Sequence, residues 1–78
     1  MIPLYGFLQG DSMGLLILAR AEDTLGRLAE KLQSAADVRV APLRRLRIVV
    51  AGRALDAEMT VAAAGLSALD KFEVTGGR

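Results

Sequence analysis

The chain has 78 residues and a mass of 8.3 kDa, which suits one small domain and excludes a second. Hydrophobic residues make up 53% of the composition and charged residues 24%, so the chain has enough apolar content to fold and is unlike a disordered segment. It contains no Cys and no His, which excludes disulfides, thiol nucleophiles, thiolate or imidazole metal sites and His-based catalytic triads.

Charge and hydropathy exclude further classes of protein. Ten basic and nine acidic residues give a net charge of +1, so no overall field attracts nucleic acid or an anionic membrane. The uncharged stretches at residues 1–10 and 12–19 are far shorter than the roughly 20 residues of a membrane span, and no basic region precedes them. We therefore expect a soluble, cytoplasmic protein with neither a nucleic-acid nor a membrane partner.

The N-terminal segment predicts a β-hairpin. Two short apolar runs, residues 2–9 and 13–19, are separated by Gly10-Asp11-Ser12, the composition of a tight turn. Pro3 cannot donate a ladder hydrogen bond, so it belongs at a strand start or at a sheet edge. Gly6 and Gly14 are typical of bulges or of close approach by a neighbouring group.

A helix is predicted after the hairpin. Glu22-Asp23-Thr24 supplies side chains that accept hydrogen bonds from free amides, so the helix should begin near Leu25 and end near Ala36. Residues 37–42 are predicted to be extended, because the residue before Pro42 avoids the helical region. The predicted core face of the helix consists of Leu25, Leu28, Ala29, Leu32, Ala35 and Ala36.

Two further strands are predicted in the second half of the chain. Residues 46–50 alternate as a strand that ends in the turn Ala51-Gly52. Thr60 is predicted to cap a short helix through Ala64, and Gly65 has the place of a left-handed C-cap. Residues 70–74 form the last predicted strand. The predicted inward residues of these strands are Leu46, Ile48, Val50, Phe72 and Val74, and the outward ones Arg45, Arg47, Lys71 and Glu73.

This order, β-β-α-β-(short helix)-β, predicts an α+β fold in which a mixed sheet packs on one helix. It is the order of the ubiquitin-like β-grasp. We predict one domain over residues 1–75 and a flexible C-terminal tail over residues 76–78.

Particular residues carry a resemblance that goes beyond the fold. The stretches concerned are Ile2-Pro3-Leu4, Glu22-Asp23-Thr24, Leu28-Ala29-Glu30-Lys31, Arg39-Val40-Ala41-Pro42, Leu46-Arg47-Ile48, Met59-Thr60-Val61-Ala62 and Ala64-Gly65-Leu66. In this order the sequence resembles the protein B family of the toluene 4-monooxygenase system, the gamma chains of bacterial multicomponent diiron hydroxylases. The resemblance implies a non-catalytic accessory subunit that docks on the large hydroxylase subunit. It also implies that the diiron centre belongs to that partner and that this chain holds no cofactor.

Two features could form the surface that docks on a partner. The second strand is apolar on both sides, whereas a β-grasp helix covers one sheet face, so contiguous apolar side chains should remain for a partner. Between Val38 and Leu55 there are several arginines and no acidic residue, which suits an interface with carboxylates, a nucleic-acid surface or a merely solvated strand. The predicted interface residues are Tyr5, Phe7, Leu16, Leu18, Arg39, Arg45 and Arg47.

Other residues are compatible with other functions. Gly76-Gly77 is compatible with a ubiquitin-like modifier or sulfur carrier, which would require removal of Arg78, and with a frayed terminus. A ubiquitin-like component of a secretion locus would share the fold. Asp11, Asp56 and Asp70 lie in predicted turns, where aspartate bonds the local backbone, so we assign them no catalytic role. No catalytic or metal-binding residue is predicted.

Overall fold

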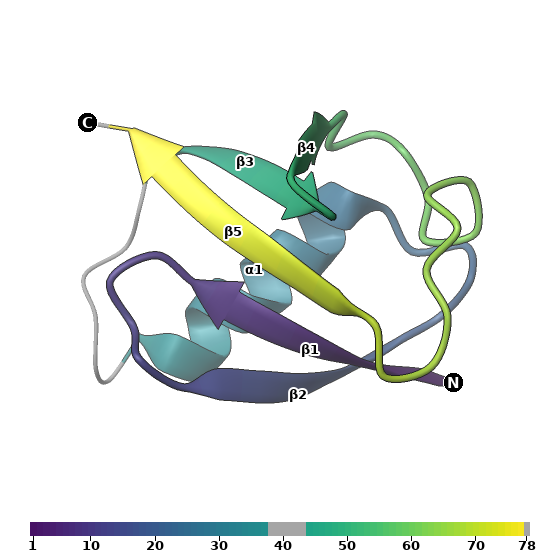
Figure 1. The fold of residues 1–78 in the computed structure, drawn as a ribbon, viewed down its shortest axis with the longest axis horizontal. Helices are drawn as coiled ribbons and strands as arrows, with labels where there is room; N and C mark the ends of the chain where they lie inside the picture. The colour runs from purple at the N-terminus through teal and green to yellow at the C-terminus, as the bar shows by residue number, and fades with distance from the viewer. Residues whose placement is uncertain (38–43, 78) are drawn as a thin grey trace.

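The computed structural model describes residues 1–37 and 44–77, which form a mixed sheet packed on a helix (Figure 1). The elements are β1 (Ile2–Leu8), β2 (Gly14–Ala19), α1 (Leu25–Ala36), β3 (Arg44–Val50), β4 (Arg53–Leu55) and β5 (Lys71–Gly77). The strand order is β2-β1-β5-β3-β4, with β1 and β5 parallel at the centre and β2 and β4 at the edges. Figure 1 shows α1 behind the sheet, so one sheet face is covered by the helix. This arrangement confirms the predicted α+β β-grasp fold.

The predicted hairpin is formed by β1 and β2, with Pro3 opposite Leu18 and Tyr5 opposite Leu16. Pro3 lies at the start of a central strand. It is tolerated there because the ladder between β1 and β5 begins only at Tyr5, so the missing N–H leaves no ladder bond unmade. The carbonyl of Pro3 accepts a hydrogen bond from the N–H of Leu69 at 2.6 Å.

The core lies between α1 and the covered face of the sheet. Phe72 and Val74 of β5 and Ile48 of β3 are buried there, as predicted from the alternation of their strands. Ala35 is exposed, contrary to the prediction, because it lies at the margin of the apolar stripe, whereas Ala36 lies near its centre. The buried residues of the helix are Leu25, Leu28, Ala29, Leu32 and Ala36.

The segment between β4 and β5 is fastened to the start of α1 by backbone hydrogen bonds. The N–H of Leu25 donates to Met59 at 2.8 Å, and the N–H of Val61 donates to Asp23 at 2.8 Å. The predicted helix after Thr60 is a hydrogen-bonded turn, although the Thr60 hydroxyl caps it as predicted, accepting from Ala63 N–H at 3.1 Å. Gly65 has the predicted left-handed conformation, with φ 73°.

Two strands differ from the prediction. No strand is predicted between the turn Ala51-Gly52 and Thr60, but β4 is a strand because Arg53 pairs with Val50 across that turn. β5 continues to Gly77 instead of ending at Val74, because Gly77 pairs with Arg44 of β3. Residues 76 and 77, which the sequence analysis assigns to a flexible tail, belong to the sheet.

Candidate protein-docking surface

Four of the predicted interface residues meet on the sheet face that α1 does not cover. Tyr5 and Leu16 are cross-strand partners, and Phe7 lies opposite Gly14, so their side chains share this face. A Cβ atom added at Gly14 would lie 2.6 Å from the Phe7 ring, so the ring lies over this glycine. Leu18 is opposite Pro3 on the same face. We call the surface made by Tyr5, Phe7, Leu16 and Leu18 the hairpin face.

The hairpin face is apolar and largely open to solvent. Leu16 is 55% exposed, Leu18 51% and Tyr5 40%, whereas Phe7 is half-buried. Side chains that alternate with these four point to the core: Leu4, Leu8 and Ile17 are buried. Both faces of the hairpin are thus apolar. Among the described residues, none covers the side chains on the face that points away from α1.

Leu69, which the sequence does not predict as a surface residue of the site, lies beside the hairpin face and is 58% exposed. Its N–H bonds to Pro3, the cross-strand partner of Leu18, and its φ of 68° lies in the left-handed region. A branched side chain rarely adopts that conformation, so the backbone here is strained. Leu69 belongs to the turn Ser67–Asp70, whose short, non-periodic sequence gives no signal that a leucine there would face outward.

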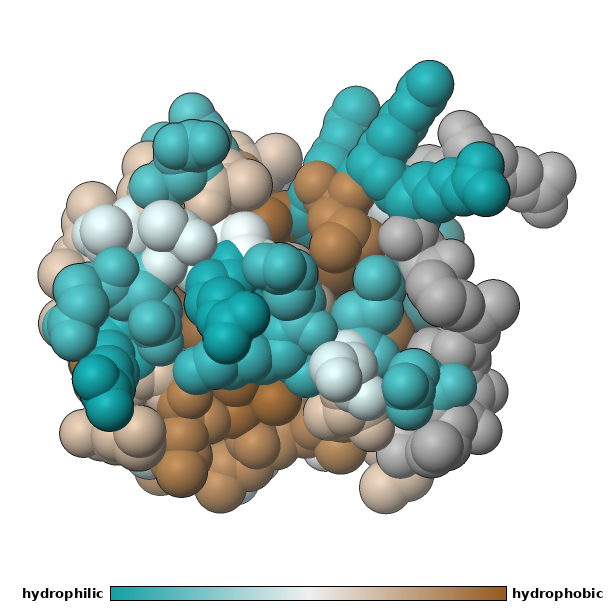
Figure 2. Space-filling view, turned by 180° about the vertical axis from the view of Figure 1, so that it is seen from behind, coloured by the Kyte–Doolittle hydropathy of each residue, from teal (hydrophilic) through white to brown (hydrophobic). Residues whose placement is uncertain are grey.

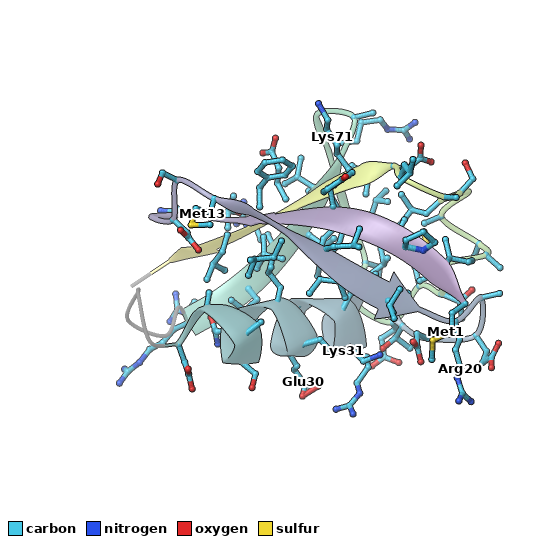
Figure 3. All side chains as sticks on the ribbon, turned by 90° about the horizontal axis from the view of Figure 1, so that it is seen from below. Met1, Met13, Arg20, Glu30, Lys31 and Lys71 are labelled. Atoms are coloured by element: carbon cyan, nitrogen blue, oxygen red, sulfur yellow. The ribbon has the colours of Figure 1, made fainter. Side chains whose placement is uncertain are left out.

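The predicted arginines are spread over a different part of the molecule. Arg47 pairs with Thr75 and therefore lies on the same open face as the hairpin, but β5, with Lys71 and Glu73, runs between them. Figure 3 shows Lys71 projecting from this face, away from α1. Arg39 lies outside the described residues. Among the residues described, none of the arginines on β3 or β4 takes part in an ion pair.

Arg45 departs from the regular alternation of β3. Between the pairs Arg44–Gly77 and Arg47–Thr75, two residues of β3 oppose one residue of β5, which is a β-bulge. Arg45 has a left-handed backbone conformation, with φ 53°, which accommodates the extra residue of the bulge. The bulge interrupts the simple alternation from which Arg45 and Arg47 are predicted to share a face, and both side chains are exposed.

Gly76 and Gly77, which precede the C-terminal Arg78, are held by the sheet. The N–H of Gly76 donates to the Gln9 Oε1 atom at 3.0 Å, and Gly77 pairs with Arg44. A diglycine that enters an activating enzyme must be extended and free of its own domain. The observed pairing therefore gives no support to the modifier or carrier alternative.

The aspartates predicted to be turn residues have that role. Asp11 Oδ1 accepts from Met13 N–H at 3.2 Å, Asp56 Oδ1 from Glu58 N–H at 2.9 Å, and Asp70 Oδ2 from Ser67 N–H at 2.9 Å. Within residues 1–37 and 44–77, no three His, Cys, Asp or Glu residues are grouped as metal ligands would be. The same part of the chain has no helix of the length and hydropathy needed to cross a membrane.

Asp23 has a shifted pKa for a structural reason. Its Oδ2 atom accepts the backbone N–H of Arg20 at 2.9 Å and lies 3.5 Å from Lys31 Nζ. The hydrogen bond from Arg20, followed by the charge of Lys31, lowers the pKa of the Asp23 carboxyl below its ordinary value of 3.8. This carboxylate fastens the turn before α1 to the helix, so its role is structural.

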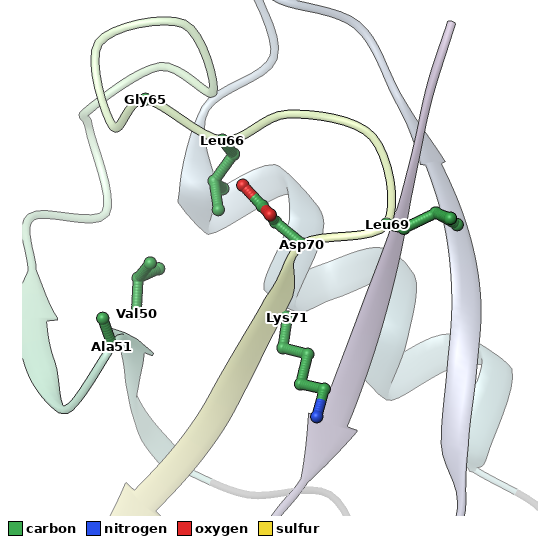
Figure 4. Close-up of a pocket in the computed structure, with 7 residues that line it drawn as sticks. All are labelled: Val50, Ala51, Gly65, Leu66, Leu69, Asp70 and Lys71. Atoms are coloured by element: carbon green, nitrogen blue, oxygen red, sulfur yellow. The ribbon is translucent and has the colours of Figure 1, made fainter.

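A shallow depression of about 430 Å³ lies between the β3–β4 turn and the loop before β5 (Figure 4). Its lining is mainly apolar, and its one carboxylate, that of Asp70, already accepts hydrogen bonds from Ser67. Small-molecule sites combine an apolar cavity with several convergent polar groups. This depression lacks them. The residues that line it are Val50, Ala51, Gly65, Leu66, Leu69, Asp70 and Lys71.

Comparisons with known structures agree with the fold. A chain from a structure described as the toluene 4-monooxygenase HD complex with the inhibitor 4-bromobenzoate superposes with a TM-score of 0.89 at 22% identity, over 97% of this chain and 98% of that one. Ubiquitin from Caldiarchaeum subterraneum superposes with a TM-score of 0.79 at 20% identity, over 99% of this chain and 94% of that one. No curated protein sequence matches significantly.

A match to a family model shows the family of the chain, which structural similarity at 20–22% identity does not show. The model described as toluene-4-monooxygenase system protein B matches residues 1–75, nearly the whole chain. The match spans the hairpin, α1 and most of β5, and it confirms the resemblance inferred from the sequence. The chain belongs to the toluene-4-monooxygenase system protein B family.

Proposed function

We propose that the chain is a non-catalytic accessory subunit of a bacterial multicomponent diiron monooxygenase, and that it docks on the large hydroxylase subunit through the hairpin face. The family match over residues 1–75 supports the subunit role. We infer the location of the docking surface from the exposure of Leu16 and Leu18 on the open sheet face.

Burial of the hairpin face gives such docking a driving force. Moving a leucine fully out of water contributes roughly 1.5–3 kcal/mol, and Leu16 and Leu18 each keep about half of that exposure in the isolated chain. Tyr5 adds an aromatic side chain with a polar tip, a type that is enriched at interface cores. Leu69 extends the same surface beyond Pro3. Arg47, on the same open face at the far side of β5, would then meet carboxylates at the polar rim.

The proposed division of labour follows from the residues this chain has. With no His and no Cys, it lacks the side chains that most metal and nucleophilic chemistry uses. We assign the diiron centre and the oxygen chemistry to the large hydroxylase subunit. The cytoplasm is the compartment we propose for the assembly, on the composition of the sequence.

Co-expression with the large hydroxylase subunit tests the proposal. The wild-type chain should co-elute with that subunit in size-exclusion chromatography. Leu18→Asp should abolish co-elution, because it would bury a carboxylate without a partner. Ala35→Asp, on the exposed surface of α1, is the matched control and should co-elute as the wild type does. If the wild-type chain fails to associate, the accessory-subunit proposal is wrong; if Leu18→Asp associates normally, the docking surface lies elsewhere.

A further inference from the structure

The outer edge of β2 carries backbone groups that point away from the sheet. β2 ends the strand order, and its inner side pairs with β1. Lys31 Nζ donates to the carbonyl of Leu18 at 3.3 Å, so this carbonyl points outward. In an antiparallel pair, the N–H and C=O of a residue point to the same side, and successive residues alternate between sides. The N–H of Leu18 and both backbone groups of Leu16 therefore point outward too.

β2 lacks the features that usually protect an edge strand. Natural edges are short, charged or interrupted by proline, which prevents another chain from pairing with them. β4, the opposite edge, fits this rule with three residues that include the exposed Arg53. β2 has six residues, Gly-Leu-Leu-Ile-Leu-Ala, and no charge. Within the described part of the chain, Lys31 alone reaches this edge, near the end of β2 (Figure 3).

Apolar side chains flank the same edge. Leu16 and Leu18 are exposed on the open face, and Leu15 is half-buried on the helix side. From the helix side, Figure 2 shows hydrophobic surface along the lower margin, where Figure 1 places β2. An added strand satisfies both features, because its backbone pairs with the outward N–H and C=O groups while its side chains cover the leucines.

We propose that the outer edge of β2 takes up an extended segment of the large hydroxylase chain, which joins the sheet as an additional strand. The inference rests on the proposed function and makes it more specific, because docking then includes backbone pairing. Since Leu16 and Leu18 belong to both surfaces, the edge is continuous with the hairpin face.

Charge indicates the composition of the added segment. Lys31, which also pairs with Asp23 at 3.5 Å, lies at the Leu18 end of the edge, and the exposed Arg20 follows β2. A segment that is apolar opposite Leu16 and acidic where it passes Lys31 complements this edge. A second copy of β2 is a poorer complement, because it carries no acidic residue.

Amide hydrogen exchange on the co-expressed complex tests the inference. The N–H groups of Leu16 and Leu18 should exchange rapidly in the isolated chain and about tenfold or more slowly in the complex with the large hydroxylase subunit, because they gain hydrogen bonds there. The amides of Leu15 and Ile17, which face β1, are the internal control and should be protected in both states.

A proline variant separates the backbone from the side chain. Leu16→Pro removes the outward N–H, keeps an apolar side chain and leaves the ladder with β1 intact. Leu16→Ala keeps the N–H and shortens the side chain. We expect Leu16→Pro to weaken binding to the hydroxylase subunit about tenfold more than Leu16→Ala does, the loss expected for a buried acceptor left unpaired.

The possible results distinguish a failure of strand addition from a failure of the proposed accessory-subunit function. If the complex forms and the Leu16 and Leu18 amides still exchange as in the free chain, strand addition is wrong and the accessory role stands. If the wild-type chain does not bind the hydroxylase subunit, the proposed function fails and the inference falls with it. Protection that rises with the concentration of the isolated chain, together with a dimer mass, would assign the edge to a second copy and overturn the proposal. If Leu16→Pro does not fold, the exchange measurement on the wild-type complex decides.

Discussion

Gly6 leaves room in the core that a larger residue would fill. A Cβ atom at this position would lie 2.8 Å from Phe72 Cζ and 3.0 Å from both methyl carbons of Leu32, and both neighbours are fully buried. Gly6→Ala should therefore lower the free energy of unfolding by about 1–3 kcal/mol, the usual cost of overpacking a core. Urea denaturation followed by circular dichroism measures it.

Gly14 provides the matched comparison for Gly6. A Cβ atom there meets the Phe7 ring at 2.6 Å, but Phe7 is half-buried on the open face and can turn toward solvent. Gly14→Ala should therefore cost less than Gly6→Ala. Equal costs would mean that the covered and open faces of the hairpin are equally rigid, contrary to the packing described.

Asp23 should make stability depend on pH in the acid range. The pKa of its carboxyl is lowered in the folded chain, first by the hydrogen bond from Arg20 N–H and then by Lys31. A lowered pKa means that the ionised form stabilises the fold above the unfolded pKa, and that this stabilisation is lost as the pH falls through the folded pKa.

Replacing Asp23 checks this sign. Asp23→Asn should be less stable than the wild type at neutral pH and should converge with it in strong acid, as urea denaturation at several pH values would show. Glu22→Gln, at the exposed neighbouring residue, controls for the loss of one negative charge. A difference between wild type and Asp23→Asn that does not vary with pH would contradict the assignment.

At the scale of elements, one side-chain hydroxyl group caps the start of α1. Thr24 Oγ1 accepts from the N–H of Arg27 at 3.2 Å, and Thr24 has the extended backbone typical of an N-cap. Thr24→Ala should lower the free energy of unfolding by about 1 kcal/mol, and Thr24→Ser should restore most of it, because serine keeps the accepting oxygen. If both variants lose the same stability, the cap hydrogen bond is not the cause. Thermal unfolding of the three proteins decides between these outcomes.

The elements also show what the sequence could predict. The hairpin, α1 and the buried residues of β3 and β5 follow from hydropathy periods and from Thr24, because burial on one face imposes those periods. β4 is too short for a period to appear, and the end of β5 consists of glycines that have no side chains to alternate. These parts form because a neighbouring strand pairs with them, which a local pattern does not encode.

The candidate surface was predictable to a similar extent and for similar reasons. Strand alternation within the predicted hairpin places four of the interface residues together: Tyr5, Phe7, Leu16 and Leu18. Leu69 reaches that surface through a left-handed turn, and Arg45 leaves the alternation through a bulge. Both depend on backbone conformations that non-glycine residues rarely adopt, so sequence alone gave no reason to expect them.

At the scale of the whole molecule, the open sheet face divides into an apolar hairpin and a charged half. Arg47 lies beyond Lys71 and Glu73 as seen from the hairpin face. Arg47→Glu should weaken association with the hydroxylase subunit by a smaller factor than Leu18→Asp, because a rim charge contributes mainly to the association rate. The association rate constant, measured at low and high salt, checks this. An effect of Arg47→Glu that is independent of salt would contradict a rim role.

The central claim is that the hairpin face contacts the large hydroxylase subunit, and site-specific photo-crosslinking tests it most directly. A photoreactive amino acid replaces Leu18 in one variant and Ala35, on the exposed surface of α1, in the other. We predict that the co-expressed complex gives a crosslink to the large hydroxylase subunit from position 18 and none from position 35. An assembled complex that crosslinks from position 35 and not from position 18 would contradict the claim.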